Sequence, residues 1–473
     1  MVRIVEILIM RKFFHVSALV MLASVMSGMV QAHAQNPMDE ASRYLRQPLP
    51  ERWSFTPDII QTLPSDDEWW RSFGDSTLDS LISVGINNNF NILEAAHRRE
   101  MARLAVRQSQ AAYYPSVGLN AGYARNYAMR KGADNFSFGA DVNWEIDIFG
   151  KISQQVKSRK AGYEASRADY VATMVSMTAE IATYYINYRV LQNQISVANE
   201  HIQYQAKVVK ITEARHEAGL VSKLDVAQSK TVYYTTEASL PRLKAQASEM
   251  LNALSILIGV YPYELAPVLI SSSTLPEYQR LIPAGVPANL LRRRPDIAAA
   301  EAQLALYAAQ VGVAKKDFLP TLALTGSIGW GSDRINKLVK SDSFTYSIAP
   351  KLSWTLFDGF SRRNAVASAK EQMLMGIDAY NLTVMTAYTE VENAMEAYNA
   401  ALESMELNRE VFIQSREAFD ISMEQYKQGL TVFTNVVNAQ IDWLNCANSL
   451  VAAHGDALIA LVDLYKALGG APQ

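Results

Sequence analysis

Two segments of this chain alternate strictly between apolar and polar side chains. From Phe136 to Ile148 every even position is apolar, and from Phe344 to Leu356 every even position is apolar or proline, while the odd positions between them are polar or small. Strands of soluble proteins are usually about 5 or 6 residues long, so alternations of this length need another setting. They are typical of a membrane β-barrel, whose strands turn apolar side chains to lipid and polar side chains to an aqueous lumen.

The two alternations belong to an internal repeat. Three pairs of landmarks are each 210 residues apart: Trp144 and Trp354, Gly219 and Gly429, and Gly259 and Gly469. The sequence around the second pair also matches, with HEAGLVSKLDV at 216–226 and KQGLTVFTNV at 427–436. A duplicated unit of this length predicts that both halves of the chain have the same order of elements.

Each half predicts a helix, two strands joined by a polar loop, a long helix, a tight break and a returning helix. The leading helices are expected at 78–112 and 295–317, and the long helices at 151–218 and 361–428. The strands are expected at 116–127, 136–149, 321–331 and 344–356, with polar loops near 129–135 and 332–343. A continuous helix of 68 residues spans about 100 Å, and apolar residues in both long helices recur with the 3.5-residue period of coiled coils.

This pattern divides the chain into five segments. They are a signal peptide (1–34), an N-terminal extended or equatorial segment (35–76), the first repeat (77–260), a proline-rich equatorial linker (261–288) and the second repeat (289–473). Within the repeats we expect strand hairpins at 116–149 and 321–357, and long helix pairs at 151–258 and 361–468.

The N-terminus has the composition of a secretory signal. Arg11 and Lys12 precede an apolar run from Phe13 to Met29, and cleavage is expected after Ala34, with translation starting at Met1 or Met10. No cysteine follows the run, so we expect no N-terminal lipid anchor. No other segment has the pattern of an apolar helix long enough to cross a bilayer, so we expect strands to make any crossing.

Composition and motifs exclude several classes of function. The formal net charge of −3 offers no basic surface for nucleic acid. The six histidines and the single Cys446 are scattered, so neither a metal site nor a disulfide framework is expected, and Cys446 is expected to be a small buried residue. The chain has no phosphate-binding glycine loop, paired-histidine zinc motif or nucleophile elbow, so we expect no enzyme and no cofactor.

Four strands cannot close a membrane barrel. The smallest membrane barrels have about eight strands, and an open edge in lipid leaves backbone groups unpaired at a cost of several kcal/mol each. Three chains would supply twelve strands, continued by a ring of paired long helices. The expected fold is therefore an α+β membrane protein with an internal repeat that is complete only as a homotrimer.

In sum the chain resembles the TolC-type outer membrane factors, in the NodT/OprM-like branch that serves resistance-nodulation-division efflux pumps. The resemblance rests on motifs in order: WEIDIFGK (144–151), the Gly-Leu break at 219, GVPANLLRRRPDI (285–297), LSWTLFDGF (352–360) and the Gly-Leu break at 429. It implies a twelve-stranded β-barrel in the outer membrane of a Gram-negative bacterium, continued by a long α-helical barrel in the periplasm.

The resemblance also implies a function and partners. The protein is expected to be the exit duct of a tripartite efflux pump, passively exporting small molecules. Its expected partners are a periplasmic adaptor (membrane fusion) protein, an inner membrane resistance-nodulation-division pump and outer membrane lipid. The main alternative is the outer membrane component of a type I protein secretion system, but LRRRPDI at 291–297 favours the pump branch.

Three groups of site residues follow from the resemblance. Adaptor docking is expected at the helix breaks, on Gly219, Leu220, Gly429 and Leu430. The gate is expected to comprise Tyr426, Thr431, Asn435, Asn438 and Asp225. Arg292, Arg293 and Arg294 are expected to pair structurally in the equatorial belt.

The gate departs from the family pattern. The family's latch arginine falls on Thr431, and its ring aspartates fall on Asn435 and Asn438. A hydrogen bond between Tyr426 and Asp225 remains available, but the stronger charge-assisted link is missing. We therefore expect a weaker latch and weaker block by divalent cations than an acidic ring would give.

Overall fold

A computed structural model of the chain describes residues 60–61, 68–128, 131–270, 275–276, 282–283 and 293–470. The expected signal peptide, most of the extended segment and half of the linker lie outside these residues. The described residues fall into two compact units. One contains Met101–Ala165 and Ala300–Asn381, and the other contains Ser166–Ala299 and Leu382–Gln473 with residues that precede Met101. Each unit draws on both halves of the chain.

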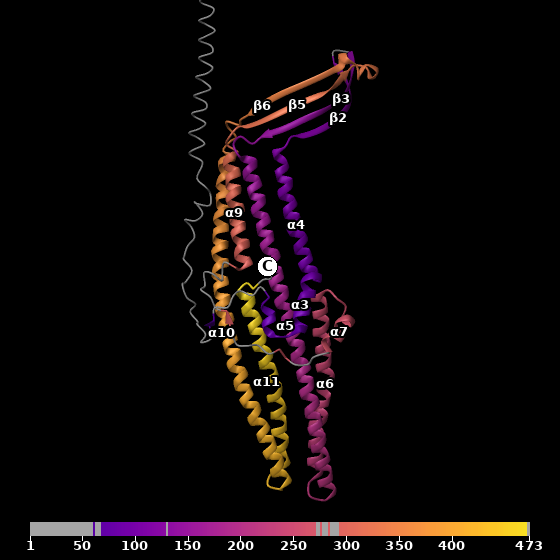
Figure 1. Cartoon of the computed structure of the whole chain (residues 1–473), viewed down its shortest axis with the longest axis vertical. Coiled ribbons are helices and arrows are strands. Elements are labelled where there is room, and N and C mark those ends of the chain that lie inside the picture. Colours follow the sequence, from indigo (N-terminus) through magenta and orange to yellow (C-terminus); the bar gives the residue numbers. More distant parts are fainter. Residues whose placement is uncertain are drawn as a thin grey trace, which may run out of the picture. The chain divides into compact units, whose positions relative to one another are not determined.

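The two halves repeat one order of elements, as the sequence predicts (Figure 1). The first half comprises η2 (Trp69–Phe73), α3 (Ser76–Asn88), α4 (Phe90–Gln110), η3 (Ala111–Tyr113), β2 (Ser116–Ala128), β3 (Lys131–Ile146), α5 (Lys151–Glu217), α6 (Lys223–Ile258) and α7 (Pro262–Ile270). The second half comprises α9 (Pro295–Lys316), β5 (Thr321–Ser332), η4 (Ile335–Lys337), η5 (Ser341–Ser343), β6 (Phe344–Ser353), α10 (Ser361–Lys427) and α11 (Phe433–Ala467). A two-residue parallel pair, β1 (Ile60–Gln61) with β4 (Ile282–Pro283), joins the N-terminal segment to the linker.

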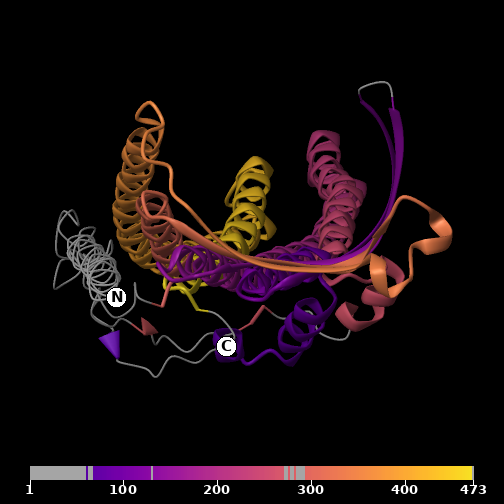
Figure 2. The same cartoon turned by 90° about the horizontal axis from the view of Figure 1, so that it is seen from above.

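The four long strands form one antiparallel sheet in the order β2-β3-β5-β6, which curves across the view of Figure 2. Its register aligns the predicted alternations from strand to strand. One row runs from Leu119 through Ala140 and Ile328 to Tyr346, and the next row of the same face runs from Val117 through Val142 and Gly326 to Ile348. The other face carries Gly118, Asp141, Ser327 and Ser347 in one row. Apolar and polar residues are therefore separated over the central rows of the sheet, as one lipid-facing and one wet face require.

The apolar face is largely exposed among the residues that the structure describes. Leu119, Tyr346 and Ile348 are each more than two thirds exposed. The sheet ends in β2 on one side and β6 on the other, and β6 contains Pro350 opposite Leu324. Proline has no backbone N–H to give to a ladder and is confined in sheets chiefly to edge strands.

The ends of the strands differ from prediction. The expected loop at 129–135 is wrong in its second part, because β3 begins at Lys131 and pairs with β2 as far as Ala128. Polar cross-strand contacts continue the hairpin there: the Tyr123 hydroxyl donates to Asp134 at 3.0 Å, and Arg125 lies 3.8 Å from the same carboxylate. At their other ends β3 and β6 stop at Ile146 and Ser353, so neither alternation is strand to its last residue.

Each hairpin is closed by the same tryptophan contact. The Trp144 indole N–H donates to the carbonyl of Tyr113, and the Trp354 indole N–H donates to the carbonyl of Phe318, both at 2.9 Å. The two contacts recur at matching places in the two repeats. They tie the end of each outgoing strand to the segment that enters the hairpin.

The first leading helix is two helices rather than the single one expected at 78–112. Asn89 separates α3 from α4 with an extended backbone, and its side-chain oxygen accepts hydrogen bonds from the N–H groups of Asn91 and Ile92. This is the geometry of an N-cap, which asparagine favours. The Asn89 amide also donates to the carbonyl of Leu257 at 2.7 Å, which fixes the break against α6.

The long helices are continuous as predicted, over 67 residues each in α5 and α10. They form hairpins with α6 and α11, and residues at coiled-coil spacing, such as Val391, Met395 and Tyr398, are buried in the largest apolar cluster. Cys446, expected to be buried, is only partly so.

By length and composition, α9 and α11 are apolar enough to cross a membrane, and the bent pair α6–α7 would be a third candidate within the described residues. The expectation that no helix qualifies is therefore wrong on this criterion. Packing accounts for much of the apolar character: Leu304, Ala308 and Val311 of α9 are buried against α10, and α11 contributes Leu458 and Leu461 to the largest cluster.

Candidate functional site: the helix breaks and their latch

The two helix breaks share one backbone geometry. Gly219 and Gly429 have φ values of +71° and +77°. The N–H of Leu220 donates to the carbonyl of Arg215, and that of Leu430 donates to the carbonyl of Gln425, both at 2.9 Å. These bonds close a Schellman-type helix end, in which the left-handed residue is normally glycine. A Cβ at either glycine would meet nothing within 4 Å, so the backbone conformation, not lack of space, requires glycine.

The breaks display apolar side chains. Leu220 is 68% exposed and Leu430 is 73% exposed, and Leu224 and Val432 beside them are also exposed. A plain helix end explains the glycine but not a leucine after each one. The four residues expected to dock an adaptor thus form two matching exposed turns.

The structure brings Tyr426 and Asp225 together, although they are 201 residues apart. The Tyr426 hydroxyl donates to Asp225 Oδ2 at 3.3 Å, while Asp225 Oδ1 accepts from the hydroxyl of Ser222, the N-cap of α6. Burial, together with the Asp225 carboxylate, raises the pKa of Tyr426 to about 12. The tyrosine therefore stays a hydrogen-bond donor throughout the physiological pH range.

Arg215 also takes part in this contact, although the sequence did not indicate it. We call the group of Tyr426, Asp225 and Arg215 the latch. Its guanidinium lies over the Tyr426 ring, 5.0 Å from the ring centre, and its Nη1 donates to the carbonyl of Lys427 at 2.8 Å. Lys427 ends α10, where the helix dipole favours a cation. A cation is thus present at the latch, but it comes from α5 of the first repeat rather than from position 431.

Thr431, Asn435 and Asn438 lie apart from the Tyr426–Asp225 contact. The Asn435 amide donates to the Thr431 hydroxyl at 2.8 Å. Asn435 and Asn438 are exposed and line a groove of about 630 Å³ between α10 and α11, together with Glu410 and Asp442. Asp442 follows Asn438 by one helical turn. The helix face that carries the neutral Asn435 and Asn438 therefore also carries a carboxylate, one turn farther from the break at Gly429.

Above the latch, α5 and α11 meet in a seam of buried polar side chains. The rings of His201 and Trp443 lie tilted to each other with centres 4.1 Å apart, and Gln205 and Gln440 are each 1% exposed. His201 Nδ1, Gln205 Oε1, Gln440 Nε2 and Trp443 Nε1 have no hydrogen-bond partner among the described residues. Burial lowers the pKa of His201 to about 4, so its ring is neutral at physiological pH.

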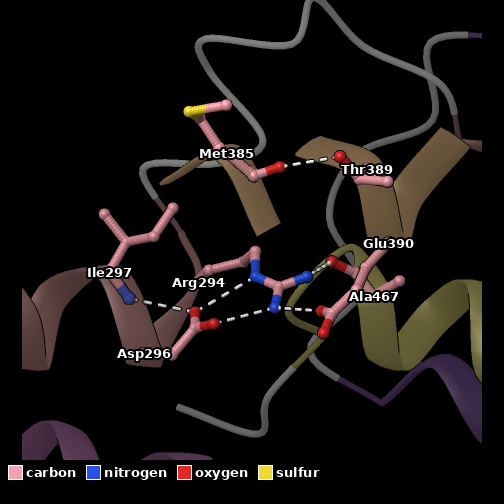
Figure 3. Close-up of polar contacts among 7 residues, drawn as sticks. All are labelled: Arg294, Asp296, Ile297, Met385, Thr389, Glu390 and Ala467. Atoms are coloured by element: carbon pink, nitrogen blue, oxygen red, sulfur yellow. Dashed lines mark hydrogen bonds and ion pairs between the residues drawn. The ribbon is translucent and has the colours of Figure 1, made fainter. Parts of the chain in front are cut away.

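Arg294 is the centre of a separate ion-pair cluster (Figure 3). Its guanidinium makes a two-pronged contact with Asp296 at 3.0 and 2.8 Å, bonds Glu390 at 2.6 Å and donates to the carbonyl of Ala467 at 2.6 Å. Its side chain is 9% exposed. Arg294 thereby joins the start of α9 to α10 and to the end of α11. Arg293 is exposed, and Arg292 lies outside the described residues.

Comparisons with known proteins converge on one description. The family model described as outer membrane efflux protein matches residues 81–260 and 286–470. The pyoverdine export outer membrane protein OpmQ of Pseudomonas putida is 29% identical over 90% of this chain and 92% of its own length. Nodulation protein T of Rhizobium leguminosarum bv. viciae is 27% identical over 86% of this chain and 84% of its own.

A solved structure gives the same result for the fold. The outer-membrane channel OprN superimposes with a TM-score of 0.83 at 29% identity, covering 90% of this chain and 98% of the channel chain.

Replacing Arg294 by alanine should lower the free energy of unfolding by about 2 to 3 kcal/mol. Removing one partner of a buried ion pair costs about 3 to 5 kcal/mol, and the loss here is smaller because the carboxylates of Asp296 and Glu390 are partly exposed. Arg293→Ala is the matched control and should change stability little. Thermal unfolding of the purified variants measures both, and equal midpoints would contradict the central role of Arg294.

Proposed function

Since the chain belongs to the outer membrane efflux protein family, we propose that it is the exit duct of a tripartite efflux pump, through which small molecules leave the periplasm passively. The protein lies in the outer membrane and extends into the periplasm, as its relatives do. One observation carries the proposal most directly: a sheet with one largely apolar face is joined in one chain to two long helical hairpins with matching exposed turns.

The assembled duct is a homotrimer with a twelve-stranded barrel. Each chain contributes four strands, and β2 and β6 are left as edges. Pairing β6 of one copy with β2 of the next satisfies the backbone of both edges, and three such joints give about the number of strands that a closed membrane barrel needs. The six long helical hairpins of the trimer then form the periplasmic tube.

The latch at the helix breaks closes this tube in the resting state. The Tyr426–Asp225 hydrogen bond and the Arg215 contacts both connect the α5–α6 hairpin to the α10–α11 hairpin. Opening requires the two hairpins to separate at their ends, which breaks these contacts. Asn435, Asn438 and Asp442 line the passage beside the latch.

The partners are an adaptor and an inner membrane pump. The exposed Leu220 and Leu430 turns offer two similar apolar contacts per chain, which suits an adaptor built from repeated helical hairpins. A protein secretion system shares this architecture, but the relatives TtgC and SrpC are named as efflux pump components, so the pump function is preferred.

Weakening the latch should open the channel. Tyr426→Phe removes one hydrogen bond and Arg215→Ala removes a second together with the ring contact, and each bond contributes about 1 kcal/mol net. The ratio of open to closed channels should rise about fivefold for each change and further for the double variant. Single-channel conductance in planar bilayers measures it. Lys427→Gln leaves the backbone acceptor of Arg215 in place and serves as the control, and unchanged gating in the double variant would contradict the latch.

Block by magnesium should be weak in the natural protein. Asn435 and Asn438, the groove residues nearest the break on α11, are neutral, and Asp442 and Glu410 supply the carboxylates of the groove. Asn435→Asp with Asn438→Asp should therefore strengthen magnesium block severalfold, whereas Asp442→Asn should reduce what block remains. Single-channel conductance measured at increasing magnesium concentration compares the natural protein with these two variants. Strong block in the natural protein that is lost in Asn435→Ala would contradict the prediction of weak block.

Photo-crosslinkers placed at Leu220 and Leu430 should capture a periplasmic adaptor in intact cells. A crosslinker at Leu407, an equally exposed leucine within α10, is the control. Capture from the two turns but not from position 407 is the expected result. Equal capture from all three positions, or capture from none, would remove the docking assignment while leaving the fold untouched.

A further inference from the structure

The turn between β6 and α10 holds a bulky residue in a strained conformation. Phe360 has φ +68° and is the one non-glycine residue with positive φ among those described. A left-handed backbone is disfavoured for any residue with a Cβ, and an aromatic residue there is an outlier. The residue 210 positions earlier is Gly150, whose φ is +75°. The second repeat thus keeps a phenylalanine where the first uses the residue that carries no strain.

The side chain of this strained residue is exposed rather than buried. Phe360 is 61% exposed and Phe357 is 77% exposed, and the two rings meet edge to face with centres 6.0 Å apart. Leu356 beside them is 77% exposed. The described chain therefore provides little packing to offset the strain, which points to a partner outside the chain.

Hydrogen bonds of Arg362 hold the turn that carries these side chains. Arg362 Nε donates to Asp358 at 2.6 Å, and its Nη1 donates to the carbonyl of Asp317 at 3.1 Å. The same guanidinium also bonds the carbonyl of Thr355 and lies over the ring of Phe318. Arg362 thus fixes the turn to the segment before β5 and to the segment after β6. The exposed apolar side chains of the turn are therefore held in one position.

The displayed residues continue the apolar face of the sheet. Leu356 extends a run of exposed even positions, which comprises Phe344, Tyr346, Ile348 and Leu352 on β6 and Trp354 just after it. Phe357 stands at an odd position, which alternation alone would assign to the polar face. The end of β6 at Ser353 and the left-handed backbone at Gly359 and Phe360 release it from that alternation.

We propose that Leu356, Phe357 and Phe360 form a wedge that inserts into the periplasmic leaflet of the outer membrane at the boundary of the barrel. Lipid is the occupant because the wedge is continuous with the face that the membrane covers, and aromatic rings favour the boundary between acyl chains and headgroups. Burial of the rings in lipid offsets the strain at Phe360. The inference rests on the proposed placement of the sheet in the membrane.

Lipid quenching of a site-specific fluorophore tests the wedge. Cys446 is the single cysteine, so a Cys446→Ser background accepts a bimane label at one chosen position of the full-length protein in phosphatidylcholine vesicles. In the Phe357→Cys protein, lipid brominated near the headgroup should quench the label at least twofold more than lipid brominated deep in the chain. Adding Phe360→Gly, which gives the turn the glycine of the first repeat, should keep the fold and reduce this quenching.

Two labels on β6 separate the possible failures. A label at Ile348→Cys on the apolar face should be quenched by lipid, and one at Ser347→Cys on the polar face should not. If Ile348 is not quenched, the membrane placement of the sheet is wrong. If Ile348 is quenched but Phe357 is not, the wedge is wrong, and Phe357 faces either water or a second copy of the chain.

Discussion

A sheet edge in a lipid bilayer must have a partner for each backbone N–H and C=O, and this requirement governs the rest of the molecule. Inside the chain it is met by the long pairing of β3 with β5, which joins the two repeats through eleven residue pairs. It is left unmet at β2 and β6. In the proposed trimer these edges pair between copies. The helices then share the symmetry of the barrel, so that one Tyr426–Asp225 contact per chain lies around a common axis.

The sequence predicted the sheet well because the alternation of side chains is a local property of a strand. Once Val142 and Ile348 are known to face the same way, the register that joins their strands has few alternatives. The segment from Lys131 to Asn135 was missed because its residues are polar and resemble a loop, whereas cross-strand contacts of Asp134 hold it in the hairpin. Asn89 was missed for a related reason: a cap inside a helical pattern shows only as one asparagine in a run of three.

The latch shows where a single sequence stops being informative. Tyr426 and Asp225 could be paired from the resemblance, but Arg215 is one of many charged residues on a long helix, and its contact with Lys427 spans 212 positions. The one local signal was its distance of four residues from Gly219. No sequence pattern indicated the seam of buried polar side chains either, which comprises His201, Gln205, Gln440 and Trp443. Each buried polar atom without a partner costs about 1 to 3 kcal/mol. Among the described residues this seam therefore holds α5 and α11 together less firmly than the apolar cluster around Tyr185 and Leu461 does.

Pro350 has a consequence for how copies of the chain recognise one another. A long apolar strand with a free edge is a template on which almost any extended chain can add, which is the first step of aggregation. A proline in that strand removes one donor from the ladder and so makes a misaligned partner less favourable. A chain bound for the outer membrane crosses the aqueous periplasm before it reaches the bilayer, and during that passage a proline in an edge strand disfavours association through that strand.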